Sequence, residues 1–138
     1  MAVNYEEIKE IADYIIKELK KDDFIIQRYD SITTNSIYLK LDYGVSNSIR
    51  ISDHKGKKHL KYKFNVNAHM DNATHKKDTL MTRNYYGRKD LETLIKHIKM
   101  LKHSKEMYLG RAGYEYEMRI CKKSGQFKKG FWQASWEV

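Results

Sequence analysis

Three stretches of the chain alternate apolar and polar residues, and this period of two constrains the fold more than any other feature. They are residues 36–44, 48–53 and 60–67. Such alternation is typical of β-strands that bury only one face. A shorter stretch, residues 24–29, precedes them and begins with apolar residues. Because turn-like segments join these stretches, we predict four consecutive antiparallel strands.

Two other segments repeat apolar residues at helical spacing. In residues 5–21 the apolar positions follow one helical face, and Asn4 and Glu7 have the spacing of a capping box at its start. Residues 89–104 carry a second apolar face of this kind. We expect both helices to cover the apolar side of the sheet, because alternating strands need cover on one side only.

The end of the chain alternates again. Residues 114–121 place apolar side chains at every second position, and residues 131–138 follow after a glycine-containing turn. We interpret these as a closing antiparallel pair, whereas residues 68–82 show no period and are expected to form a long loop. The sequence therefore predicts a single α+β domain over residues 1–138. It has an antiparallel sheet of about five to six strands, two helices packed on one face, and the order α-β-β-β-β-α-β-β.

The balance of charged residues is strongly basic. Among 138 residues, 27 Lys and Arg stand against 18 Asp and Glu, which gives a formal net charge of +9. A field of this sign attracts polyanions, so we expect the partner to be nucleic acid, a nucleoprotein complex or an acidic protein surface. A lysine-rich surface that serves only solubility is the alternative interpretation.

Other features of the composition restrict the setting and the chemistry. Cys121 is the one cysteine, so no intramolecular disulfide can form, and no apolar run reaches the ~18 residues of a membrane span. We expect a cytoplasmic protein without membrane contact. No glycine-rich phosphate loop, nucleophile elbow or paired-cysteine site occurs, which favours a binding protein without cofactor or catalytic residue over an enzyme.

The polar positions of the central strands form the first candidate site. If the apolar positions face the helices, alternation places the polar positions together on the opposite side. A tyrosine among lysines there can stack on a base while the lysines contact phosphates. The predicted contact residues are Tyr38, Lys40, Arg50, Lys61 and Lys63, with Lys57 and Lys58 in the adjoining loop. A solvated strand face that uses lysine against edge pairing is the alternative.

The predicted second helix carries a row of lysines on its outer side. Lys96 and Lys99 are the residues of this row that we expect to contact a polyanion. An ordinary solvated helix face, with lysines that favour the negative end of the helix dipole, explains the same pattern.

Histidines and a carboxylate lie close together in the predicted long loop. His69, Asp71 and His75, with His54 after an earlier strand, are candidate ligands of a divalent metal. Such a site could activate water for phosphodiester cleavage, so a small metal-dependent nuclease or phosphodiesterase is the alternative function. The spacing matches no helical zinc motif, and histidines that only face solvent or order the loop are the simpler interpretation.

Aromatic residues gather near the end of the chain. Most of them should be buried, but Phe131 has the opposite strand parity to Trp132 and Trp136, so one of them is expected at the surface. An interaction module that uses this aromatic end, either in a homodimer or as a subunit, is a third interpretation.

One stretch of about a quarter of the chain resembles a known class of proteins. Residues 35–66 carry a serine and tyrosine pair, a turn, and then the run Arg-Ile-Ser-Asp-His at residues 50–54. This pattern is similar to small accessory proteins of phages and mobile elements, among them inhibitors of bacterial defence such as anti-CRISPR proteins. The resemblance implies an inhibitor that acts in the host cytoplasm, and it implies no catalytic residue.

Overall fold

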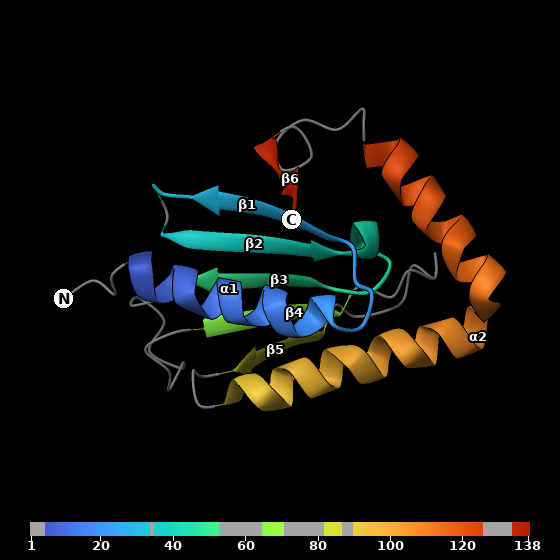
Figure 1. The fold of residues 1–138 in the computed structure, drawn as a ribbon, viewed down its shortest axis with the longest axis horizontal. Coiled ribbons are helices and arrows are strands. Elements are labelled where there is room, and N and C mark those ends of the chain that lie inside the picture. The colour runs from blue at the N-terminus through green and yellow to red at the C-terminus, as the bar shows by residue number, and fades with distance from the viewer. Residues whose placement is uncertain (1–4, 34, 53–64, 71–81, 87–89, 126–133) are drawn as a thin grey trace.

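The computed structural model describes residues 5–33, 35–52, 65–70, 82–86, 90–125 and 134–138. In this part of the chain two helices and an antiparallel sheet form an α+β fold (Figure 1), as the hydrophobic periodicity predicts. No helix in these ranges is both long enough and apolar enough to cross a membrane. The elements are, in order, α1 (Tyr5–Lys20), β1 (Ile26–Ser31), β2 (Ser36–Leu41), the 3-10 turn η1 (Asp42–Gly44), β3 (Ser48–Ser52), β4 (Asn65–Met70), β5 (Thr82–Tyr86), α2 (Leu91–Gly125) and β6 (Trp136–Glu137).

The strands lie in the sheet in the order β5-β4-β3-β2-β1-β6, and each neighbouring pair is antiparallel. Consecutive strands from β1 to β5 are therefore neighbours in the sheet, as in an antiparallel meander. β6 returns from the far end of the chain to pair with β1, where Trp136 lies opposite Arg28.

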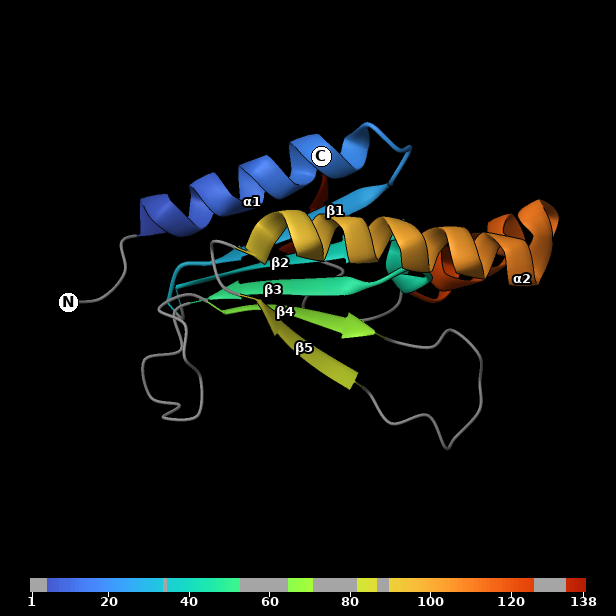
Figure 2. The same ribbon diagram turned by 90° about the horizontal axis from the view of Figure 1, so that it is seen from below.

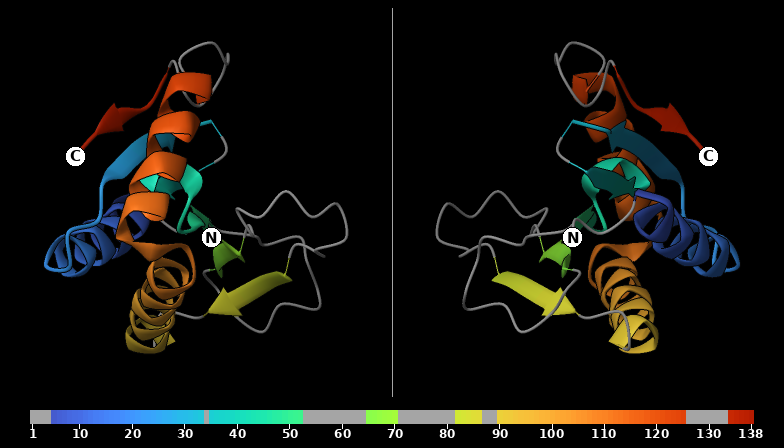
Figure 3. Two further views of the ribbon diagram at one scale, coloured as in Figure 1. Left: turned by 90° about the vertical axis from the view of Figure 1, so that its right-hand side faces the viewer. Right: turned by 90° about the vertical axis from the view of Figure 1, so that its left-hand side faces the viewer.

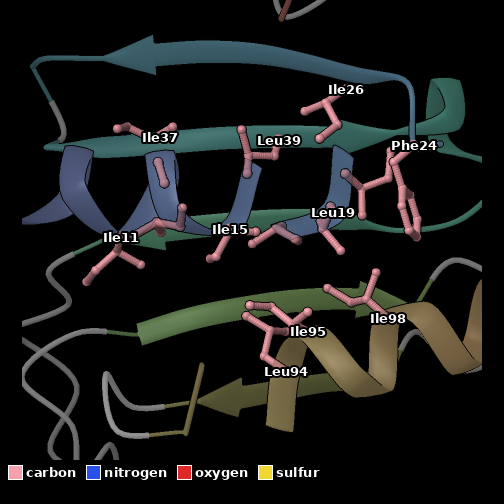
Figure 4. Packing of buried hydrophobic residues seen from close by; sticks show 14 of the residues in the cluster. Ile11, Ile15, Leu19, Phe24, Ile26, Ile37, Leu39, Leu94, Ile95 and Ile98 are labelled. Carbon is pink, nitrogen blue, oxygen red and sulfur yellow. The ribbon is translucent and has the colours of Figure 1, made fainter. Parts of the chain in front are cut away.

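Both helices cover one face of the sheet. Figures 2 and 3 show α1 and the first half of α2 side by side on the same side of the strands. The core fills the layer between the helices and the sheet (Figure 4). There, Ile15 and Leu19 of α1 and Leu94 and Ile98 of α2 are at most 1% exposed. Burying such a side chain stabilises the fold by roughly 1.5–3 kcal/mol.

The prediction of a strand over residues 114–121 is wrong, because α2 continues through them to Gly125. The predicted closing pair does not form either, since residues 136–137 pair with β1 instead. Within the described ranges the observed order is thus helix, five strands, helix and one short strand.

The boundaries of the middle strands also differ in detail from the expectation. The predicted loop, residues 68–82, contributes its first three residues to β4 and its last to β5, while residues 71–81 lie outside the described ranges. The strand expected over residues 60–67 is observed as Asn65–Met70, and residues 60–64 also lie outside those ranges.

Gly110 divides α2 into two straight parts. Its φ of 73° and ψ of 162° belong to a backbone region that is essentially restricted to glycine. The chain turns there, so that residues 111–125 rise across the ends of the central strands near η1 (Figure 1). This turn brings the second part of α2 against the connection between β2 and β3.

Candidate functional site

The central strands separate their side chains by parity. Ile37 and Leu39 of β2 and Ile51 of β3 are buried beneath the helices, whereas Tyr38 and Arg50 point to the other side and are half-buried. We call this other side, which faces away from α1 and from the first half of α2, the distal face. Lys40 shares it, so the described members of the predicted strand site lie together.

A row of aromatic and cationic side chains crosses the distal face at right angles to the strands. Tyr29 of β1 is the register partner of Tyr38 in β2, and Tyr38 is the partner of Arg50 in β3. The two tyrosine rings have their centroids 6.0 Å apart with a tilt of 31°. Arg50 Cζ lies 5.4 Å from the centroid of the Tyr38 ring, within the range of a cation–π interaction. Tyr29 is a member of the site that the sequence analysis missed.

The register extends this row and adds a second one beside it. At the backbone level, Arg50 pairs with Asn67 of β4, which pairs with Tyr85 of β5. Two residues further along each strand, a second row of register partners runs through Glu137, Gln27, Lys40, Ser48, His69 and Arg83. At the level of register positions, a row rich in aromatic residues therefore lies beside a row with two cationic positions, Lys40 and Arg83, and one acidic position, Glu137. At the other side of the aromatic row, Ser36 and Ser52 are buried, so the accessible part of the face is centred on Tyr38.

Arg28 and Arg50 differ in the carboxylate partners of their guanidinium groups. Arg28 lies on the helix side of the sheet, where its guanidinium contacts Asp13 and Asp30 at 2.8 Å each. Burial lowers the pKa of Arg28, but the hydrogen bonds to Asp30 and Asp13 outweigh this effect and raise it. No carboxylate of the described residues pairs with Arg50 in this way, and its Nε is buried without a hydrogen-bond partner, as is Gln27 Oε1 on the same face.

An unsatisfied buried polar atom costs about 1–3 kcal/mol, and in native structures it calls for an explanation such as a bound water or ion. The charge of Arg50 is therefore not neutralised by the part of the molecule that the structure describes, unlike that of Arg28.

Several lysines of α2 form contacts within the molecule. Lys99 pairs with Asp22 at 2.9 Å, and Lys102 pairs with Asp42 at 3.0 Å. Lys105 donates to the carbonyl oxygens of Val45 and Ser46, both at 2.8 Å. Lys96 is exposed. Since α2 covers the opposite side of the sheet, the structure does not bring Lys96 and Lys99 together with Arg50.

Asp42 is the centre of a buried polar cluster that the sequence analysis did not anticipate. Its side chain is 1% exposed and accepts hydrogen bonds from Ile25 N at 2.9 Å and from the Tyr114 hydroxyl at 2.5 Å, besides the ion pair with Lys102. Asp42 and Tyr43 both have left-handed backbone angles, with φ of 52° and 59°. Such angles are uncommon for a bulky residue, and the contacts of α2 hold this turn in place.

A cavity of about 500 Å³ lies beside this cluster, between the turn after α1 and the kink of α2. Its charged lining is mixed, and consists of Asp22, Asp23, Glu106, Glu115, Lys102 and Arg111. Arg111 is already paired with Glu115 at 3.5 Å. Because both acids and bases line it, the cavity indicates no single ligand chemistry.

Other predicted site residues fall outside what the structure describes. Lys57, Lys58, Lys61 and Lys63 do so entirely, as do the candidate metal ligands His54, Asp71 and His75, while His69 is placed only by its backbone in β4. In the described ranges no group of three or more His, Cys, Asp or Glu is arranged to hold a metal ion. Trp136 is 47% exposed and packs over Arg28, whereas Phe131 and Trp132 lie outside those ranges.

Comparisons of the chain with protein-family models, with curated proteins and with solved structures find no match.

Proposed function

We propose that the protein is a non-enzymatic binding protein for nucleic acid or a nucleoprotein complex, and that the distal face is its contact surface. The observation that carries this proposal is Arg50, whose guanidinium lies over the Tyr38 ring without a described carboxylate partner. A guanidinium held in this way can contact a phosphate while the ring beside it contacts a base.

The distribution of charge supports the same surface. Three lysines of α2 form contacts within the molecule: Lys99 with Asp22, Lys102 with Asp42, and Lys105 with backbone carbonyl oxygens. The charges of this row are therefore largely used within the molecule. The segment that joins β3 to β4, residues 53–64, contains five lysines and one aspartate in its sequence. The net charge of +9 adds a long-range field that speeds encounter with a polyanion.

The resemblance of residues 35–66 to phage accessory proteins suggests one setting for this activity. In that setting the partner is the nucleoprotein effector of a bacterial defence system, and the protein inhibits it stoichiometrically by occupying its nucleic acid or the channel that holds it.

Two charge reversals of equal size test the proposal. Arg50→Glu changes the distal face, and Arg111→Glu makes the same change of charge at a side chain that is 93% exposed on α2. We expect Arg50→Glu to weaken binding of a labelled nucleic acid about ten- to hundredfold, as the loss of a charge-assisted contact does. Arg111→Glu should change it less than about threefold, because a distant surface charge is screened.

Binding is measured by fluorescence anisotropy at physiological salt, and thermal unfolding of each variant verifies that it folds. If the two folded variants bind alike, or if nucleic acid does not bind the unaltered protein, the distal face is not a nucleic-acid surface.

A further inference from the structure

We infer that the distal face recognises a single strand, with successive bases packed on Tyr29 and Tyr38 and the backbone directed toward Lys40 and Arg50. This inference rests on the proposed function and specifies its substrate class, because a face that binds phosphates alone accepts duplexes equally well. Three features favour a single strand: the spacing of the two rings, the width of the sheet and the order of the rows.

The spacing of the rings does not match stacked bases in a duplex. Bases of one strand of B-DNA follow each other at about 3.4 Å, whereas the centroids of Tyr29 and Tyr38 are 6.0 Å apart. Bases that pack on both rings must therefore be drawn apart from each other. A single strand can do this easily, but a duplex must first lose its stacking and pairing.

The width of the sheet also disfavours a duplex. Neighbouring strands lie about 4.8 Å apart, so the five strands from β1 to β5 measure about 19 Å from the first to the last. The major groove of B-DNA is about 12 Å wide and admits a helix or a two-stranded ribbon. A sheet of this width can meet only the phosphates of a duplex, and the tyrosines would then have no base within reach.

The arrangement of the rows suits the two parts of a single-stranded chain. Tyr29 and Tyr38 are register partners, and Arg50 continues their row, so two tilted rings neighbour each other and a cation lies over the second ring. Lys40 lies two residues beyond Tyr38 on the same strand and face, about 7 Å along the strand. Bases on the tyrosines thus leave the sugar–phosphate backbone beside Lys40 and Arg50.

The decisive experiment compares three ligands of equal length: a strand with bases, a strand without bases, and a duplex whose bases are paired. Anisotropy titrations use a labelled oligothymidylate, an abasic strand of the same length and a duplex of the same length. The unaltered protein should bind the oligothymidylate at least about tenfold more tightly than either of the others, since stacking on aromatic rings is worth ~1–3 kcal/mol per base.

Variants of the two tyrosines then test whether the bases pack on their rings. Tyr38→Ala and Tyr29→Ala should each weaken binding of the oligothymidylate about 5- to 150-fold, which is the same stacking energy expressed as affinity. Tyr38→Phe should retain most of the affinity because the ring remains. Tyr116→Ala is the control, because Tyr116 is an exposed tyrosine on α2.

The outcomes separate this inference from the proposed function. If Arg50→Glu abolishes binding but the three ligands bind alike and the tyrosine variants have no effect, the face binds phosphates only, and the inference falls while the proposed function stands. If none of the three ligands binds, the proposed function fails and the inference fails with it. Preference for the oligothymidylate that Tyr38→Ala removes and Tyr38→Phe preserves supports both.

Discussion

The hydroxyl of Tyr114 donates a hydrogen bond of 2.5 Å to Asp42 Oδ2, and this contact joins the second half of α2 to the turn between β2 and β3. The two residues are 72 positions apart in the chain and both are buried. Lys102 reaches the same carboxylate, so two positions on α2 are tied to one buried acid. The contact fixes α2 at the end of the strands that carry the distal face.

We expect Asp42→Asn to destabilise the protein by about 3–5 kcal/mol, because it leaves the ammonium of Lys102 beside an amide in a buried site. The backbone angle of Asp42 is not the cause of this loss, since asparagine also adopts left-handed angles readily. Tyr114→Phe keeps the ring and loses one hydrogen bond to a charged group, which should cost about 1.5–3 kcal/mol. Urea unfolding gives both values. Similar losses for the two variants would contradict a central role for Asp42.

The same contact predicts a response to alkaline pH. Burial raises the pKa of Tyr114, and the neighbouring Asp42 carboxylate raises it further. A group with a raised folded-state pKa stabilises the fold fully below its unfolded pKa, about 10 for tyrosine, and loses that contribution as the pH rises above it. The stability advantage of the unaltered protein over Tyr114→Phe should therefore shrink above pH ~10.

Urea unfolding between neutral and alkaline pH measures this effect. Tyr116→Phe is the matched control, because Tyr116 lies on the same helix and is 56% exposed. Its effect on the free energy of unfolding should stay within about 0.5 kcal/mol, because substitutions at exposed positions change stability little. A constant difference for Tyr114→Phe as well would show that its hydroxyl is not buried against Asp42.

Much of the distal face follows from the sequence because of strand parity. The apolar residues of β2 and β3 alternate without interruption, and this pattern alone places Tyr38, Lys40 and Arg50 on one side of the sheet. Tyr29 was missed because β1 carries Arg28 at a core position. The burial of a cation there depends on Asp13 and Asp30, and that contact between α1 and β1 is not evident from the local pattern.

The second half of α2 shows why alternation alone is ambiguous. Tyr114 and Met118 are four residues apart, and so are Tyr116 and Ile120, so the alternating run also forms two stripes on a helix. A strand and a helix both satisfy this pattern locally. In the helix, Tyr114 contacts Asp42, which lies 72 positions earlier in the chain. A contact over such a distance cannot be inferred from the alternating run itself.

Asp30 predicts an opposite response at acid pH. Burial raises the pKa of Asp30, but hydrogen bonds from Arg28 and Tyr5 outweigh this and lower it. A lowered folded-state pKa stabilises the fold above the unfolded value, ordinarily 3.8, and that contribution is lost as the pH falls through the folded-state pKa. The loss of stability below pH ~4 should therefore be less steep in Asp30→Asn than in the unaltered protein.

Acid titration followed by circular dichroism measures this slope. Asp13→Asn is the comparison, since Asp13 contacts the same arginine but its side chain is 57% exposed, and exposed pairs contribute little. An equal change of slope in both variants would show that the burial of Asp30 does not determine how stability falls with pH.

Gly110→Ala tests the turn within α2. With φ at 73° and ψ at 162°, an alanine in this conformation should cost about 1–3 kcal/mol, although no atom lies within 4 Å of the position of its Cβ. The strain is relieved if the helix straightens, which separates Tyr114 from Asp42. Urea unfolding and the hydrodynamic radius should therefore report lower stability and a larger molecule.

Gly113→Ala is the control for this change, because Gly113 has helical angles and its added Cβ meets only Leu109 Cβ at 3.3 Å. Its effect should stay within about 1 kcal/mol, since the gain in helix propensity offsets the close contact. Unchanged stability and size in Gly110→Ala would show that the turn does not require glycine.

The salt dependence of binding separates the roles of Arg50 and Tyr38 on the distal face. For single strands, the logarithm of the binding constant falls with the logarithm of the salt concentration with a slope of about −0.7 for each neutralised phosphate. Arg50→Gln should reduce this slope by about one phosphate, because its cation is lost. Tyr38→Ala should lower the affinity at every salt concentration and leave the slope unchanged, because stacking releases no counterions. Anisotropy titrations between about 50 and 200 mM salt measure both quantities. If Tyr38→Ala also flattens the slope, the ring acts by holding Arg50 in place and not by contacting a base.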